Sequence, residues 1–180
     1  QQVERIAERI HKGENIALIS DAGTPGISDP GFLLTRTCIK HGIETECLPG
    51  ATAFVPALVN SGFPCDRFCF EGFLPQKKGR QKKLNALLEE TRTMIFYESP
   101  FRIVKTLEQM STIFGANRYA CVAREISKMF EEFKRGTLEE LISYYTQNTA
   151  KGEIVLLVAG KEYNAEEGET TIEIDDSMSE

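Results

Sequence analysis

The segment from Leu18 to Gly31, LISDAGTPGISDPG, combines glycines, prolines and two aspartates directly after an apolar run. Glycines let a backbone approach a ligand closely and expose its N–H and C=O groups. Thr24 adds a hydroxyl, and Asp21 can accept a hydrogen bond from a ribose hydroxyl or a cationic group. The loop is also longer than a simple connection from a strand to a helix requires. We therefore expect this loop to bind a small ligand.

The same loop has a second interpretation as a tight turn followed by a helix. Asp29, Pro30 and Gly31 are typical of a helix start, with Asp as N-cap and Pro at the first helical position. The glycine spacing of a P-loop is present as well. However, Phe32 and Leu33 stand where a P-loop has Lys and Ser or Thr, which argues against an NTPase.

A run of cations follows Phe73. Five of the seven positions from 77 to 83 are basic, namely Lys77, Lys78, Arg80, Lys82 and Lys83. Such a run suits contacts with nucleic-acid phosphates, and Phe73 offers a ring for base stacking. A solvated helix face is the alternative.

Hydrophobic periodicity predicts the scaffold for these residues. Helices are expected at the N-terminus up to Gly13, after Asp29, at 51–60, in the basic segment, from Ser99 to Gly115 and after the Thr137–Glu140 capping box. Strands are expected at 15–20, 44–48, 93–97, 119–123, 129–135 and 154–158.

This order predicts an α/β protein of two halves. The first half, residues 1–67, alternates strand and helix, which indicates a parallel sheet. The second half, residues 68–161, has a mixed sheet in which 119–123 and 129–135 pair antiparallel. The first sheet lacks the strands with which a doubly wound sheet begins, so we expect N-terminal sequence to be missing.

Charge and cysteine content narrow the class of protein. The net charge of −6 divides into −8 for an acidic tail, residues 162–180, and +2 for the rest, which is compatible with an anionic partner. Five cysteines without a C-x-x-C pair, beside two histidines, give no zinc framework. We expect buried, reduced thiols in a cytoplasmic protein. No apolar run approaches the length of a membrane span.

Five motifs occur in order along the chain: LISDAGTPGISDPG, LPGATAFVPAL, DRFCFEGFLPQKKGR, MIFYESPFR and GEIVLLVAG. As a set they resemble the ribosomal RNA small-subunit methyltransferase I family, a member of the tetrapyrrole methylase superfamily. The resemblance covers residues 1–160. Family members open with a strand and a P-T-P-x-G-N loop, which this chain lacks.

The resemblance implies a two-domain α/β fold with S-adenosylmethionine (S-adenosyl-L-methionine) in the cleft between the domains. It implies 2′-O-methylation of a cytidine ribose in the small-subunit (16S) ribosomal RNA by a homodimer, without metal and away from membranes. With it, RNA contact becomes the favoured interpretation of the basic run.

The resemblance also assigns cofactor contacts. The first loop borders the methionine end of the cofactor, mostly through backbone groups, with Asp21, Ala22, Gly23, Thr24, Pro25 and Ile27. Thr52 and Ala53 lie where relatives contact the cofactor, and Ala123 and Glu153 lie where relatives place the adenosine. A simple helix cap is the alternative for Thr52, and a core position is the alternative for Ala123.

Methyl transfer from a sulfonium to a ribose hydroxyl depends on alignment and is helped by a base, or by a cation that lowers the pKa of the hydroxyl. The candidates for this catalytic role are Glu98, Arg102, Arg124 and Glu125. Ion pairs that hold the domains together are the alternative for all four. Two other functions stay open: methylation of a tetrapyrrole or another small molecule, and an inactive fragment that binds RNA or nucleotide.

Overall fold

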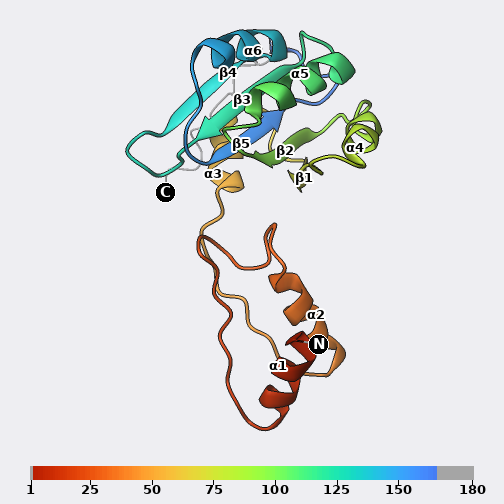
Figure 1. The fold of residues 1–180 in the computed structure, drawn as a ribbon, viewed down its shortest axis with the longest axis vertical. Helices are drawn as coiled ribbons and strands as arrows, with labels where there is room; N and C mark the ends of the chain where they lie inside the picture. The colour runs from red at the N-terminus through yellow and green to blue at the C-terminus, as the bar shows by residue number, and fades with distance from the viewer. Residues whose placement is uncertain (1, 166–180) are drawn as a thin grey trace, which may run out of the picture.

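Residues 2–165, which a computed structural model describes, contain six helices and five strands (Figure 1). In chain order these are α1 (Gln2–His11), α2 (Gly31–Lys40), α3 (Phe54–Ser61), β1 (Phe68–Phe73), α4 (Arg80–Ala86), β2 (Thr93–Glu98), α5 (Ile103–Phe114), β3 (Tyr119–Arg124), β4 (Glu132–Thr137), α6 (Leu138–Gln147) and β5 (Ile154–Val158). Most of the predicted acidic tail, from residue 166 onward, lies outside the described residues.

The five strands form one mixed sheet in the order β1-β2-β5-β3-β4. β1 and β2 run parallel, with Phe73 opposite Tyr97, and β5 is antiparallel to both β2 and β3. Ile154, at the start of β5, lies opposite Glu98 on one side and Arg124 on the other. The last residues of β1, β2 and β3 and the first of β5 therefore share one edge of the sheet.

Apolar side chains of the central strands alternate between the two faces of the sheet, as pleated geometry requires. On one face, Met94 and Phe96 pack with Leu107 in the layer that contains α5 and α6 (Figure 1). On the other face, Ile95 and Leu157 belong to the cluster that includes α3. All residues of β5 are buried, as expected for a continuous apolar run in a central strand.

Residues 2–53 contain two helices but no strand, unlike the part of the described chain that forms the sheet. α1 and α2 contact each other, and Figure 1 shows them below the sheet, joined to it by extended segments. The strands predicted at 15–20 and 44–48 are absent, since no strand precedes β1 in the described chain. An apolar run becomes a strand only where another strand offers a hydrogen-bonding edge, and neither segment pairs with a described strand. Their side chains stay exposed, Ile19 to 85% and Leu48 to 71%.

The predicted parallel first sheet is therefore wrong for the described structure, whereas the mixed sheet of the second half is confirmed, with two differences: β1 was not predicted, and β4 begins three residues later than predicted. The strands predicted at 93–97, 119–123 and 154–158 correspond to β2, β3 and β5, and β4 pairs antiparallel with β3. The capping box is present: the Thr137 hydroxyl accepts from the backbone of Glu140, and the Glu140 carboxylate accepts from the backbone of Thr137.

Helix length, metal-ligating side chains and cysteines were also compared with the expectations from the sequence. Every helix within residues 2–165 is too short or too polar to cross a bilayer. The same residues hold no group of three or more His, Cys, Asp or Glu side chains placed for a metal ion. All five cysteines are free, and the expectation of buried thiols holds for Cys38 and Cys121 but not for the exposed Cys47 and Cys65.

Candidate active site

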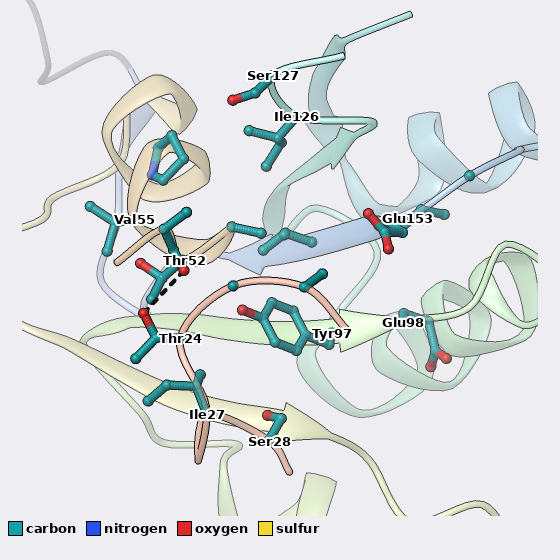
Figure 2. A pocket seen from close by; sticks show the side chains of 18 of the residues that line it. Thr24, Ile27, Ser28, Thr52, Val55, Tyr97, Glu98, Ile126, Ser127 and Glu153 are labelled. Atoms are coloured by element: carbon teal, nitrogen blue, oxygen red, sulfur yellow. Dashed lines mark hydrogen bonds between the residues drawn. The ribbon is translucent and has the colours of Figure 1, made fainter. Parts of the chain in front are cut away.

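A cavity of about 780 Å³ opens at the sheet edge where β1, β2 and β3 end and β5 begins (Figure 2). Its walls come from segments that are distant in the sequence, namely residues within 22–28, 50–56, 97–100, 126–127 and 152–155, together with Phe73. The carboxyl ends of strands are where α/β folds place their ligands. The size is that of a cofactor site.

The glycine-rich loop is docked onto the loop before α3. The backbone N–H and the hydroxyl of Thr24 both donate to the carbonyl oxygen of Ala51, at 2.9 and 3.2 Å. Gly23 has a φ of +72°, and a Cβ there would lie 2.9 Å from the Ala51 oxygen. A Cβ at Gly50 would lie 2.8 Å from the Thr24 hydroxyl. The close contact between the two loops therefore depends on glycine on both sides.

The second half of the glycine-rich loop starts a helix. Asp29 Oδ1 accepts from the backbone N–H of Gly26 at 2.9 Å and of Gly31 at 2.6 Å. Helix α2 begins at Gly31, one residue later than predicted, with Pro30 at the N-cap position. Asp29 thus satisfies backbone donors at the helix start and is not part of the cavity wall.

Most of the residues predicted to contact a cofactor come together around the cavity. They are Ala22, Gly23, Thr24, Ile27, Thr52, Ala53 and Glu153. Asp21 and Pro25 belong to the same loop but do not line the cavity. Ala123 is fully buried in the core cluster that includes residues of α3. This burial agrees with the alternative interpretation of Ala123 as a core position.

Sequence reasoning singled out Phe73 but missed Tyr97, the other aromatic ring in the cavity wall. Figure 2 shows the Tyr97 ring in the middle of the site, and its centroid lies 5.5 Å from that of Phe73. Burial raises the pKa of Tyr97. In the sequence, Tyr97 ends an apolar run that reads as core, and only the parallel register of β1 and β2 brings the two rings together.

Unusual backbone conformations also mark this site. Within the part of the chain that the structure describes, three residues other than glycine have a positive φ: Ser28 (60°), Glu125 (51°) and Ser127 (63°). Ser28 and Ser127 line the cavity, and Glu125 precedes Ile126, which also lines it. Such conformations cost free energy and cluster at functional sites.

Glu98, a predicted catalytic residue, ends β2 with a side chain that is only 1% exposed. Its Oε1 accepts from the Ser99 backbone at 2.7 Å and from Arg102 Nε at 2.9 Å. Its Oε2 accepts from the Thr106 hydroxyl at 2.7 Å and from Arg80 Nη2 at 3.4 Å. Both oxygens are thus engaged by protein donors, so the geometry makes Glu98 an anchor for the turn that follows β2.

The basic run divides into two groups. Arg80 is buried: besides Glu98, its Nε donates to Gln109 at 2.6 Å and its Nη2 donates to the hydroxyl of Thr106 at 2.5 Å. Lys83 forms an ion pair with Glu71. The other cations are exposed, namely Lys77, Lys78 and Lys82. Lys77 and Lys78 lie in the loop after β1, and Lys82 lies in the first turn of α4. Because Phe73 ends β1 and lines the cavity, this loop starts at the cavity edge.

Arg124 and Glu125 are placed beside the cavity rather than in its lining. Arg124 Nε donates to Glu132 at 2.6 Å across the β3–β4 pair, and this hydrogen bond raises the pKa of Arg124. Glu125 accepts from the backbone of Glu153 at 2.9 Å and from Lys128 at 3.0 Å. These two donors lower the pKa of Glu125.

Glu153 lies at the opposite end of the cavity from Thr24 in Figure 2, on the same side as Glu98. Its carboxylate is 77% exposed and accepts from Lys128 at 2.9 Å. The Glu125 carboxylate occupies the space that a side chain at Gly152 would need. The turn that presents Glu153 is therefore fixed by Glu125 and requires glycine at 152.

The fold has counterparts among known proteins. The family model of Tetrapyrrole (Corrin/Porphyrin) Methylases matches residues 1–142. Among solved structures, the methyltransferase CobJ has a TM-score of 0.65 at 23% identity, over 88% of this chain and 70% of that chain. A uroporphyrin-III C-methyl transferase from Thermus thermophilus, complexed with S-adenyl homocysteine, has a TM-score of 0.57 at 16% identity, over 87% and 71%. The fold is that of the tetrapyrrole methylases.

Curated relatives narrow this class. The ribosomal RNA small subunit methyltransferase I of Synechocystis sp. is 49% identical over 160 residues, which are 88% of this chain and 57% of the relative. The proteins of the same name from Escherichia coli O157:H7 and Thermotoga maritima are 45% and 41% identical, over 93% and 90% of this chain and 59% and 72% of their own lengths. The chain belongs to the ribosomal RNA small subunit methyltransferase I family, as its motifs predicted. It spans little more than half the length of the first two relatives.

Proposed function

We propose that this chain is part of an S-adenosylmethionine-dependent enzyme that methylates the 2′-hydroxyl of a cytidine ribose in small-subunit ribosomal RNA. The observation that carries the proposal is the cavity between two loops, each of which holds one of the family-like motifs. The bonds from Thr24 to Ala51 join these loops at the cavity. The names of the relatives supply the substrate class.

The residues around the cavity fit this cofactor. The backbone of Ala22 and Gly23 borders the cavity and offers polar groups to an amino-acid moiety. Ile27 and Tyr97 provide apolar walls, and the exposed carboxylate of Glu153 can accept hydrogen bonds from ribose hydroxyls. When bound, S-adenosylmethionine supplies an electrophilic methyl group on a sulfonium sulfur. Together with Thr24, Thr52 and Ala53, these residues form the proposed cofactor set.

The protein contributes mainly alignment to this reaction, because a sulfonium is already a good leaving group. We place the four candidate catalytic residues in positioning roles, which their contacts favour. Glu98 and Arg102 hold the turn after β2, which borders the cavity. Glu125 holds the turn that presents Glu153, and Arg124 braces the β3–β4 pair.

RNA contact in this proposal uses the exposed lysines of the basic run, Lys77, Lys78 and Lys82, for phosphates. Phosphate contacts position a substrate without reading its sequence. Arg80 and Lys83 are paired with the carboxylates of Glu98 and Glu71, so the proposal does not use them for phosphates. The proposal also includes a homodimer in the cytoplasm and a division into a domain of residues 1–67 and a domain of residues 68–161.

Methyl transfer from labelled S-adenosylmethionine tests the proposal most broadly. The acceptors are small ribosomal subunits that lack their native modification and, in parallel, a free tetrapyrrole. We expect label in the ribosomal RNA, at a ribose 2′-oxygen. Label in the tetrapyrrole alone would support the small-molecule alternative, and cofactor binding without transfer to either acceptor would support a binding fragment.

Charge reversal separates the RNA contact from general electrostatics. The double variant Lys77→Glu, Lys78→Glu changes two exposed lysines beside the cavity. The matched control Lys12→Glu, Lys40→Glu makes the same change in net charge at the ends of α1 and α2. We expect weaker RNA binding and a shallower salt dependence only for the first variant, with cofactor affinity unchanged in both. Equal effects would assign the loop to a solvated surface.

A further inference from the structure

Phe101 has the most exposed large apolar side chain that the structure describes, at 96%. A phenylalanine ring left in water forgoes the stabilisation that burial would give it. The exposed ring lies next to the cavity in the sequence, because Phe101 follows Ser99 and Pro100, which both line the cavity.

The turn that carries this ring is held rigidly. The Ser99 hydroxyl accepts from the Phe101 backbone at 3.3 Å, and the Ser99 carbonyl accepts from the Arg102 backbone at 2.9 Å. The buried carboxylate of Glu98 binds both Ser99 and Arg102. Arg80 ties the same carboxylate to helix α4. The ring is thus presented to solvent on a fixed turn, which is how preorganised contact surfaces are built.

The two loops that leave this edge of the sheet carry aromatic and basic residues. Because β1 and β2 are parallel and Phe73 pairs with Tyr97, the loops after both strands leave the sheet at the same edge. Phe73, which is 55% exposed, ends β1, and the loop after it carries the exposed lysines 77 and 78. The other loop carries Phe101 and is followed by Arg102 and the exposed Lys105.

We propose that Phe101 is a stacking platform for an unpaired nucleobase of the RNA substrate, next to the nucleotide that enters the cavity. The inference rests on the proposed function. An unpaired base needs a flat apolar surface with cations nearby for its phosphates, and the rim of this cavity provides both. Phe101 belongs to the motif MIFYESPFR, but no role could be assigned to it from the sequence, because a lone Phe after Ser-Pro carries no signal of exposure.

Affinity for RNA gives the first test. The probe is a fluorescein-labelled single-stranded oligocytidylate of about ten nucleotides, a length within the usual range of single-strand sites. Phe101→Ala is expected to bind it roughly 5- to 150-fold more weakly, the usual effect of removing one stacking ring, and Phe101→Tyr is expected to restore binding. Phe68→Tyr is the matched control, because Phe68 is at the other end of β1 and outside the cavity wall.

Fluorescence gives a second, direct test. The chain has no tryptophan, so Phe101→Trp introduces a single reporter at the platform and Phe68→Trp introduces one away from it. Stacking of a base quenches indole fluorescence. We expect the oligocytidylate to quench Phe101→Trp and not Phe68→Trp, and a duplex of the same length, whose bases are already stacked, to leave both unquenched.

Several outcomes would overturn the inference. Wild-type affinity of Phe101→Ala, or RNA binding without quenching of Phe101→Trp, removes the platform while leaving the proposed function intact. A change in sedimentation of Phe101→Ala without RNA assigns the ring to a contact with another protein chain. Failure of the unaltered chain to bind RNA and to transfer methyl groups overturns the proposed function and the platform together.

Discussion

The two halves of the described chain build their shares of the cavity in different ways. In residues 68–158 the central strands are almost completely buried, whereas between residues 2 and 53 the buried apolar side chains are Ala7 and Cys38 alone. Both halves line the same cavity. Low burial means low local stability, so the sheet provides a rigid wall and the glycine-rich loops provide an adaptable one, docked through the bonds from Thr24 to Ala51.

This difference suits a site that must admit a large ligand. The buried strand ends fix the direction of Tyr97 and of the turn after Glu98, and Figure 2 shows both labelled side chains at the site. A loop held by few contacts can open and close over a ligand on a microsecond to millisecond timescale. Matched substitutions, one in each half, test whether the two halves differ in stability in this way.

Removal of a buried carboxylate should give the largest contrast in stability. Glu98→Ala leaves Arg80 buried without its ionic partner, so we expect a loss of about 3–5 kcal/mol in the free energy of unfolding. Glu14→Ala breaks the exposed pair with Arg9 in the first half and should cause no measurable change. Urea-induced unfolding compares the two, and equal losses would contradict the difference between the halves.

Leucine truncation should give the next largest contrast. Leu157→Ala empties a fully buried position in β5, and cavities of this kind cost about 2–5 kcal/mol. Leu48→Ala changes a side chain that is 71% exposed and should stay within about 0.5 kcal/mol of the unaltered chain. A loss at Leu48 as large as that at Leu157 would show that this segment is buried in solution.

A pH titration should give the smallest effect. The backbone of Glu153 and Lys128 lower the pKa of Glu125 from its ordinary value of 4.5, so the ionised carboxylate stabilises the folded state. This stabilisation is complete above the ordinary pKa and is lost as the pH falls through the lowered one. The chain and its Glu125→Gln variant should therefore differ in urea midpoint at pH 7 and converge in acid. A difference that grows on acidification would contradict the assigned contacts.

Local signals in the sequence predicted the helices and strands whose structure is decided by residues close in the chain. The apolar run of β5 and the capping box at Thr137 are examples, because periodicity and side-chain chemistry specify them within a few residues. The runs around Ile19 and Leu48 look alike in sequence but lack a pairing edge in the described chain. A strand depends on a partner that local sequence does not reveal.

In the site, too, local sequence predicts only those features that do not depend on distant residues. The glycine-rich loop could be predicted, because glycine allows backbone conformations that other residues avoid and proline fixes φ, so both mark loops locally. The burial of Arg80 could not, since a buried arginine and an exposed lysine look the same in a run of charges. Its partners Glu98, Thr106 and Gln109 lie 18 to 29 residues away. Tyr97 joins the site only through the register of the sheet.

Cofactor binding by two glycine variants tests whether S-adenosylmethionine binds between the two loops. Gly23 and Gly42 have similar positive φ values, 72° and 67°, so alanine strains the backbone similarly at both. Only at Gly23 would a Cβ meet a neighbour, the Ala51 oxygen at 2.9 Å, whereas nothing lies within 4 Å at Gly42.

Calorimetric titration with S-adenosylmethionine should show one site on the unaltered chain. We expect the same affinity for Gly42→Ala and an affinity roughly tenfold lower, about 1.4 kcal/mol, for Gly23→Ala. No binding by the unaltered chain, or equal affinity of the two variants, would contradict a cofactor site between the two loops.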